Sequence, residues 1–107
     1  MRFAILLAPQ AAESLQALPA RQRAAVKNTL ETHLRHEPTK VSRSRIKRLR
    51  GLSQPQYRLR VGEIRVFYDV TDEAVEILAI VTKAEAQAWL AEEGTPDPGG
   101  GAGEDEG

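Results

Sequence analysis

The sequence predicts a small α+β domain, in which two N-terminal helices pack on one face of a twisted antiparallel sheet and a short helix ends the fold. Three observations support this class: apolar residues at helical spacing in residues 9–36, three strand-like stretches between Tyr57 and Thr82, and a helical stretch before Gly94. A chain of 107 residues can bury one modest core. The expected order is strand, helix, helix, three strands, helix.

The N-terminal part predicts one strand and a pair of helices. Residues 2–7 form an apolar run that ends at Ala8 and Pro9, which is typical of a buried strand followed by a helix with proline in its first turn. Pro19 ends that helix, and a second helix is expected over residues 20–36. Since the turn between them is short, the two helices should form an antiparallel hairpin that covers one face of a sheet.

The middle of the chain predicts a basic loop and then a meander. Residues 36–55 have no periodicity, contain six Lys and Arg between Lys40 and Arg50, and are interrupted by Pro38, Gly51 and Pro55, so we expect a long loop. The dipeptide Gly62-Glu63 suits a tight hairpin turn, and residues 71–73 suit a slightly longer one. The three antiparallel strands are expected at Tyr57–Val61, Ile64–Val70 and Ala74–Thr82.

The C-terminal part predicts a helix and a tail. A helix is expected over Lys83–Glu93, with Gly94 just past its end. From Gly94 the chain reads GTPDPGGGAGEDEG, which has no aliphatic side chain larger than alanine and cannot offset the entropy of ordering. We therefore expect a folded domain over residues 1–93 and a disordered acidic tail over residues 94–107 that adds nothing to stability.

The charges are distributed unevenly. All 15 Lys and Arg lie between Arg2 and Lys83, whereas six of the 15 acidic residues lie after residue 91, so residues 1–91 carry 15 basic and nine acidic side chains, a formal charge of about +6. There is no cysteine, which excludes disulfides and thiolate ligands and suits a reducing cytoplasm. No apolar run approaches the roughly 20 residues that span a bilayer, so no membrane segment is expected.

Several basic residues should converge on one face of the sheet. In the strand Tyr57–Val61 the alternation sends Arg58 and Arg60 to the face opposite Leu59. Arg65 lies just across the tight turn, and Lys83 follows the last strand. Guanidinium groups bind phosphate oxygens bidentately, so this set predicts a polyanion site, most simply for RNA, although any one of these arginines alone would suit a solvated polar face. The loop residues expected to join it in RNA binding are Lys47, Arg48 and Arg50.

Other candidate sites have less support. His33 and His36 are one helical turn apart, but no third ligand accompanies them, so no metal site is expected. Trp89 is expected in the core or in a partner contact rather than as a platform for bases. The sequence has no glycine-rich phosphate loop and no serine nucleophile elbow, and no cofactor is expected.

Residues 48–81, RLRGLSQPQYRLRVGEIRVFYDVTDEAVEILAIV, resemble the core of the RelE/ParE-type toxins of type II toxin–antitoxin systems. The most specific part is the series LRG, YRLR, VG and RVFY, and the likeness extends over almost all of residues 1–91. The resemblance implies a small twisted sheet with helices and a cognate antitoxin, which we expect to be acidic because residues 1–91 are basic. It also implies a target: RelE relatives cut messenger RNA on the ribosome, whereas ParE relatives act on DNA gyrase.

The resemblance also implies roles for single residues. Arg58, Arg60 and Arg65 match the basic groups that hold the phosphate and promote attack by the 2′-hydroxyl, and Lys83 matches a further basic position. The sequence departs from the nuclease pattern after the last strand, because Ala84 replaces an arginine and Trp89 or Leu90 replaces a tyrosine. The groups at these positions cannot transfer a proton.

The function expected from this match is a metal-free, ribosome-dependent mRNA endoribonuclease with weakened catalysis. Two alternatives remain open. One is a non-enzymatic toxin that binds gyrase, and the other is a degenerate member of the family that binds its antitoxin and co-represses the operon.

Overall fold

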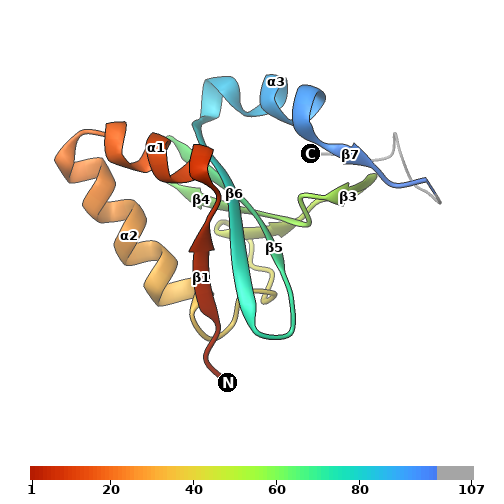
Figure 1. Cartoon of the computed structure of the whole chain (residues 1–107), viewed down its shortest axis with the longest axis horizontal. Helices are drawn as coiled ribbons and strands as arrows, with labels where there is room; N and C mark the ends of the chain where they lie inside the picture. Colours follow the sequence, from red (N-terminus) through yellow and green to blue (C-terminus); the bar gives the residue numbers. More distant parts are fainter. Residues whose placement is uncertain (99–107) are drawn as a thin grey trace.

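The structure is a computed structural model, and it describes residues 1–98. It consists of three helices, a five-stranded sheet and a separate two-stranded sheet (Figure 1). No helix in the described range is long and apolar enough to cross a membrane. The elements are β1 Ala4–Leu7, α1 Pro9–Ala17, α2 Ala20–Leu34, β2 Ile46–Arg48, β3 Leu52–Gln54, β4 Tyr57–Val61, β5 Ile64–Val70, β6 Ala74–Thr82, α3 Lys83–Glu93 and β7 Thr95–Pro96.

The main sheet has the strand order β1-β6-β5-β4-β2. The α+β class, the helix pair and the three-strand meander are confirmed, but the sheet is mixed rather than antiparallel, because β1 pairs in parallel with β6. β1 is also an edge strand: Leu6 is 52% exposed, so the expectation of a buried first strand is wrong. Ile5 and Leu7, on the other face of β1, pack on the main core.

The predicted basic loop contains two short strands. β2 pairs with β4, with Ile46 opposite Leu59, and its start is held by the Ser42 hydroxyl, which accepts hydrogen bonds from the main-chain N–H groups of Arg45 and Ile46. The chain then turns at Gly51, whose φ of 78° suits glycine, and enters β3. Strands of three residues are too short to show a period of two, so no sequence pattern indicated them.

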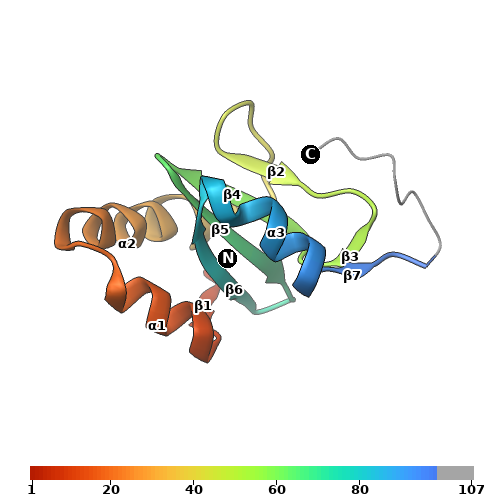
Figure 2. The same ribbon diagram turned by 90° about the horizontal axis from the view of Figure 1, so that it is seen from above.

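Two hydrophobic clusters cover the two faces of the sheet. The larger lies between the sheet and α1–α2, and includes Leu15, Leu30 and Leu34 of these helices. The smaller lies under α3 on the opposite face and is built around Leu49 and Phe67. Figure 2 shows the hairpin on one side of the sheet and α3 on the other. The face that carries the arginines is therefore partly covered.

A ring stack and a bulge shape the packing on the two faces of the sheet. The ring of Trp89 stacks on Phe67 with centroids 5.1 Å apart and 5° between the planes, so this partly buried tryptophan packs on the smaller cluster, while a partner contact stays a prediction. The β5–β6 register shifts next to Phe67, so that Phe67 pairs with Ala79 but Tyr68 pairs with Ile77. In a regular strand, residues three apart point to opposite faces. The bulge adds one residue to β6, so that Ile77 and Ile80 both face the larger cluster.

The segment after α3 differs from the expected disordered tail. β7 pairs with β3, and the Asp97 N–H donates to the Gly51 carbonyl at 3.0 Å. The first residues after Gly94 are thus part of the folded domain. The remainder of the predicted tail, residues 99–107, lies outside the described residues.

A buried hydrogen bond ties the loop after α2 to the sheet. The fully buried Tyr68 donates its hydroxyl to the Pro38 carbonyl at 2.7 Å, and burial raises the pKa of this phenol. We expect Tyr68→Phe to lower the free energy of unfolding by about 1–3 kcal/mol, because the buried carbonyl loses its donor. Urea denaturation measures this. Tyr57→Phe is the control, and equal midpoints for the two variants would contradict the prediction.

Candidate functional site

Three arginines lie together on the face that α3 covers. Arg60 of β4 is directly opposite Arg65 of β5, and Arg58 is opposite Phe67. Directly opposite residues of an antiparallel pair share a face, with Cβ atoms about 5 Å apart. The hairpin turn at Gly62, with φ 59°, brings the two strands together so early that Arg60 and Arg65 are only five residues apart in sequence.

A cavity of about 220 Å³, which we call the arginine cavity, lies between these strands and α3. Arg58 and Arg65 contribute cations from the sheet, and Lys83 and Gln87 line it from the helix. α3 begins at Lys83 because the Thr82 hydroxyl accepts from the Glu85 N–H while the Glu85 carboxylate accepts from the Thr82 N–H. The apolar lining consists of Leu49, Phe67, Ala86 and Leu90.

The arginines of this cavity carry positive charge that the described residues compensate only in part. Burial lowers the pKa of Arg58, and repulsion from Arg65 and Arg60 lowers it further. Burial and Arg60 also lower the pKa of Arg65, whereas Glu63 opposes them. An anion in the cavity would relieve this repulsion, so the electrostatics favour a negatively charged ligand.

The hydrogen bonds leave donors available. Arg65 is 8% exposed, and its Nη1 donates to the carbonyls of Gly62 and Ile64 at 2.8 and 3.1 Å. The Nε of Arg58 is buried and has no hydrogen-bond partner. A buried unpaired donor is costly, so the Nε of Arg58 would gain from an acceptor that a ligand brings.

The structure separates the remaining predicted residues. Lys47 is opposite Arg58 and therefore shares the arginine face, whereas Arg48 is opposite Tyr57 and lies on the other face. The Arg48 guanidinium lies 5.1 Å from the centroid of the Tyr57 ring and donates to the Gln56 carbonyl. Arg50 is exposed in the turn before β3. Arg60 is exposed beside the cavity without lining it, so only Arg58, Arg65 and Lys83 of the predicted set meet there.

Sequence reasoning placed Lys83 in the site but missed Gln87 and the covering of the arginine face by α3. Gln87 and Leu90 line the cavity because α3 crosses the arginine face, which no local pattern indicates. The apolar wall could have been anticipated in part, since Phe67 shares strand parity with Arg65. Ala84, at the position of the nuclease arginine, is exposed and does not line the cavity.

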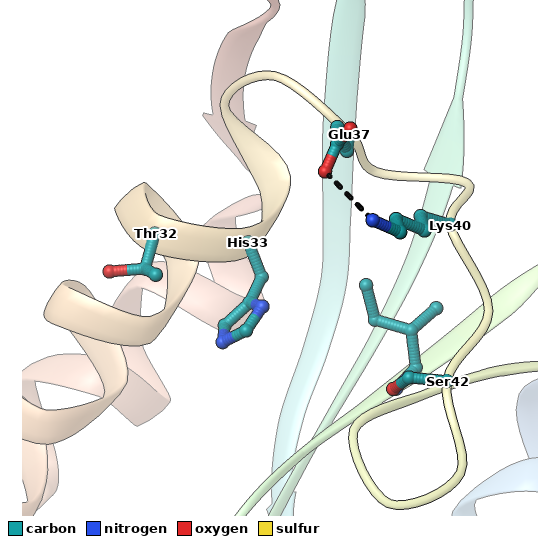
Figure 3. A pocket seen from close by; sticks show the side chains of 6 residues that line it. Thr32, His33, Glu37, Lys40 and Ser42 are labelled. Carbon is teal, nitrogen blue, oxygen red and sulfur yellow. Dashed lines mark hydrogen bonds and ion pairs between the residues drawn. The ribbon is translucent and has the colours of Figure 1, made fainter.

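The two histidines do not face a common site. His33 projects from α2 into a separate pocket of about 380 Å³ (Figure 3), where Glu37 and Lys40 form an ion pair at 3.7 Å. The Nδ1 of His36 lies 3.1 Å from the Met1 carbonyl oxygen. Within residues 1–98 no three His, Cys, Asp or Glu side chains are grouped as a metal site requires. This pocket shares no residue with the arginine cavity.

Comparison with known proteins identifies the fold and the family. Residues 5–87 match the family model described as the ParE toxin of the type II toxin–antitoxin system parDE. No protein with a curated description matches the chain. Among solved structures, the archaeal RelE–RelB complex from Pyrococcus horikoshii OT3 contains a chain that is 26% identical, with a TM-score of 0.64, and the alignment covers 78% of this chain and 97% of that one.

Two further structures agree with this assignment. The toxin–antitoxin complex RelBE2 from Mycobacterium tuberculosis matches with 27% identity and a TM-score of 0.63, and the alignment covers 77% of this chain and 99% of that one. The YoeB dimer from Staphylococcus aureus matches with 21% identity and a TM-score of 0.59, and the alignment covers 76% of this chain and 97% of that one. Because the identity is low, this match supports the fold alone. Because the family model spans most of the chain, this protein belongs to the ParE toxin family of type II toxin–antitoxin systems, within the RelE/ParE superfamily.

Proposed function

We propose that this toxin acts in the cytoplasm by binding ribosome-bound messenger RNA through the arginine cavity and cleaving it slowly. The observation that carries the proposal is the buried Nε of Arg58, which has no partner, beside the buried Arg65. The cavity offers guanidinium donors and an apolar wall, which suit the phosphate and the base of one nucleotide. Lys47 on the same face extends the positive surface along the RNA backbone.

The chemistry that fits this site is transfer of the phosphoryl group to the neighbouring 2′-oxygen. The 2′-hydroxyl loses its proton to water, its oxygen attacks phosphorus, and the bond to the 5′-oxygen breaks as that oxygen takes up a proton, so the products are a 2′,3′-cyclic phosphate and a 5′-hydroxyl. Arg58 and Arg65 would stabilise the charge that develops on the phosphoryl oxygens, and Lys83 would give a proton to the 5′-oxygen. Leu90 lines the cavity without a group that can accept the 2′-hydroxyl proton, which accounts for slow cleavage.

A specific observation favours a second function. The match to the ParE model, together with alanine at position 84 and leucine at position 90, suits a toxin that binds DNA gyrase without chemistry. In that case the arginines would contact acidic groups of the enzyme. The two functions differ in what the purified protein does to RNA.

The test is to add the purified toxin to a translation reaction and map messenger RNA ends by primer extension. Cuts that appear only with ribosomes, and that weaken in Arg58→Ala, are expected. The same protein is assayed for inhibition of DNA supercoiling by gyrase. Inhibition of gyrase with intact messenger RNA would replace the proposed function by the second one.

We also propose that an acidic antitoxin covers the basic surface of this domain. Two of the similar solved structures are toxin–antitoxin complexes. One is the RelE–RelB complex from Pyrococcus horikoshii OT3, and the other is the RelBE2 complex from Mycobacterium tuberculosis. The formal charge of about +6 on residues 1–91 favours an acidic, partly disordered partner that folds on binding.

Coexpression with the neighbouring reading frame should therefore give a stable complex in size-exclusion chromatography. The complex should lose affinity as salt rises, because the attraction between opposite charges is screened. Recovery of the toxin alone, at high yield from the coexpressing cells, would contradict this prediction.

A further inference from the structure

Helix α3 covers the arginine cavity with few anchors of its own. None of its residues is fully buried, and it contacts the sheet through the partly buried Ala86, Trp89 and Leu90. Its N-terminal end is fixed, because α3 follows β6 directly and begins with a capping box. The position of its other end depends on what holds residues beyond Glu93.

Residues 94–97, which we call the C-terminal clasp, hold that other end. The Gly94 N–H donates to the Leu90 carbonyl at 2.9 Å, and β7 then pairs with β3. The Ser53 hydroxyl donates to the Thr95 carbonyl at 3.3 Å, and the Asp97 N–H donates to the Gly51 carbonyl. The clasp thus fastens the end of α3 to β3 and to the turn before it, through hydrogen bonds at Thr95 and at Asp97.

Gly94 is required by close packing rather than by its backbone conformation. Its φ of −69° is open to any residue. A Cβ atom at this position, however, would lie 2.6 Å from the Leu90 carbonyl oxygen and 3.2 Å from the Leu52 Cδ2. Leu52 packs in the same cluster as Phe67 and Trp89, so a side chain on residue 94 would push the helix end away from the wall of the cavity.

β3, to which the clasp is fastened, is itself tied to the centre of the sheet. The Gln54 Nε2 and the Gln56 N–H both donate to the buried Asp69 carboxylate of β5, each at 2.7 Å. The Val70 N–H donates in turn to the Gln56 Oε1. The end of α3 is therefore connected through β7 and β3 to the strand that carries Arg65.

We infer that the C-terminal clasp is a positioning element for the arginine cavity, and that it holds Gln87 and Leu90 over Arg58 and Arg65. Residues 94–97 touch no phosphate in this scheme; they act through α3. A helix held in place keeps water away from the guanidinium groups, which strengthens their bonds to an anion. The effect on RNA rests on the proposed function, whereas the position of the helix does not.

The chain contains a single tryptophan, Trp89, which reports the position of α3 directly. Three variants are compared: truncation after Glu93, which removes the clasp; truncation after Pro98, which keeps it; and Gly94→Ala in the full chain. We expect the first and third to shift Trp89 emission to the red and to increase quenching by acrylamide. Truncation after Pro98 should match the unmodified protein.

The same variants are titrated with a single-stranded RNA oligonucleotide. Loss of the clasp should weaken binding roughly tenfold, the size of one charge-assisted contact, with unchanged helix content by circular dichroism. Trp89 emission that is equal in the two truncations would overturn the inference. A shift in Trp89 without a change in RNA affinity, where Arg58→Ala does weaken binding, would overturn the positioning role. If Arg58→Ala leaves RNA binding intact while Trp89 responds, the proposed function fails and the hold on α3 stands.

Discussion

Replacing Arg58, Arg60 and Arg65 together by alanine is expected to abolish growth arrest and to lower affinity for single-stranded RNA at least about a hundredfold, since each charge-assisted hydrogen bond is worth roughly 1.5–3 kcal/mol. Arg58 and Arg65 lie in the cavity and Arg60 beside it, so the change removes every arginine on this face of the β4–β5 hairpin. The salt dependence of binding should also flatten, by about 0.7 in the log–log slope for each phosphate that the variant no longer binds. Expression from a repressible promoter and fluorescence anisotropy at several salt concentrations measure the two effects.

The control removes the same charge from another surface. Arg2, Arg21 and Lys27 are exposed, and the triple alanine change there should leave growth arrest intact. Because Arg65 also bonds main-chain carbonyls, the exposed Arg60 is changed alone as well, and thermal melting checks that each variant folds. Arg58→Lys should bind RNA more tightly than Arg58→Ala, because it keeps the positive charge, but less tightly than the unmodified protein, because it lacks the planar guanidinium group. Growth arrest that survives the triple Arg58, Arg60 and Arg65 change would rule out this face as the toxic site and favour gyrase.

Introducing a proton-transfer group is expected to raise cleavage of messenger RNA by about 10²- to 10⁴-fold, the usual contribution of general acid–base catalysis. Leu90→Tyr places a phenol in the lining of the cavity, opposite Arg58 and Arg65. Ala84→Arg adds a cation on the exposed side of α3, next to Lys83. The double variant restores both residue types that the family resemblance expects, and primer extension on translating ribosomes measures the rate.

The matched control is Ala84→Arg with Leu90→Phe, which has the same ring without the hydroxyl. It should cut no faster than the unmodified protein if the phenol provides the chemistry. Thermal melting of both variants shows whether the larger ring fits against Leu52 and Trp89, which pack in the same cluster. Equal rates for the tyrosine and phenylalanine variants would show that the missing hydroxyl is not what limits cleavage.

Local patterns in the sequence were enough for the helices and for the central hairpins. Pro9 and Pro19 mark the helix starts, and Gly62 marks a turn whose positive φ only glycine adopts readily. The alternation of YRLRV predicted that Arg58 and Arg60 point to one face of the strand and Leu59 to the other. The structure has this arrangement, with Leu59 in the larger cluster. These features depend on neighbours within a few residues, so a single sequence contains them.

Partners that are distant in sequence decided the remaining features. β1 lies parallel to a strand 70 residues later, and β7 pairs with β3 across more than 40 residues, pairings that no local period indicates. The bulge beside Phe67 reversed the parity of β6. These features follow from which surfaces must be buried together, a property of the whole chain.

The candidate site shows the same division. The sequence alone determined that Arg58, Arg60 and Arg65 share one face of a strand pair, because the pleat and a two-residue turn allow no other arrangement. Only the tertiary structure decided that α3 closes that face, that Gln87 and Leu90 complete the cavity, and that Arg48 points to the opposite side. The reason is physical: strand periodicity is set by the backbone, whereas the covering of a face depends on the apolar area that Trp89, Leu90 and Leu52 bury against Phe67.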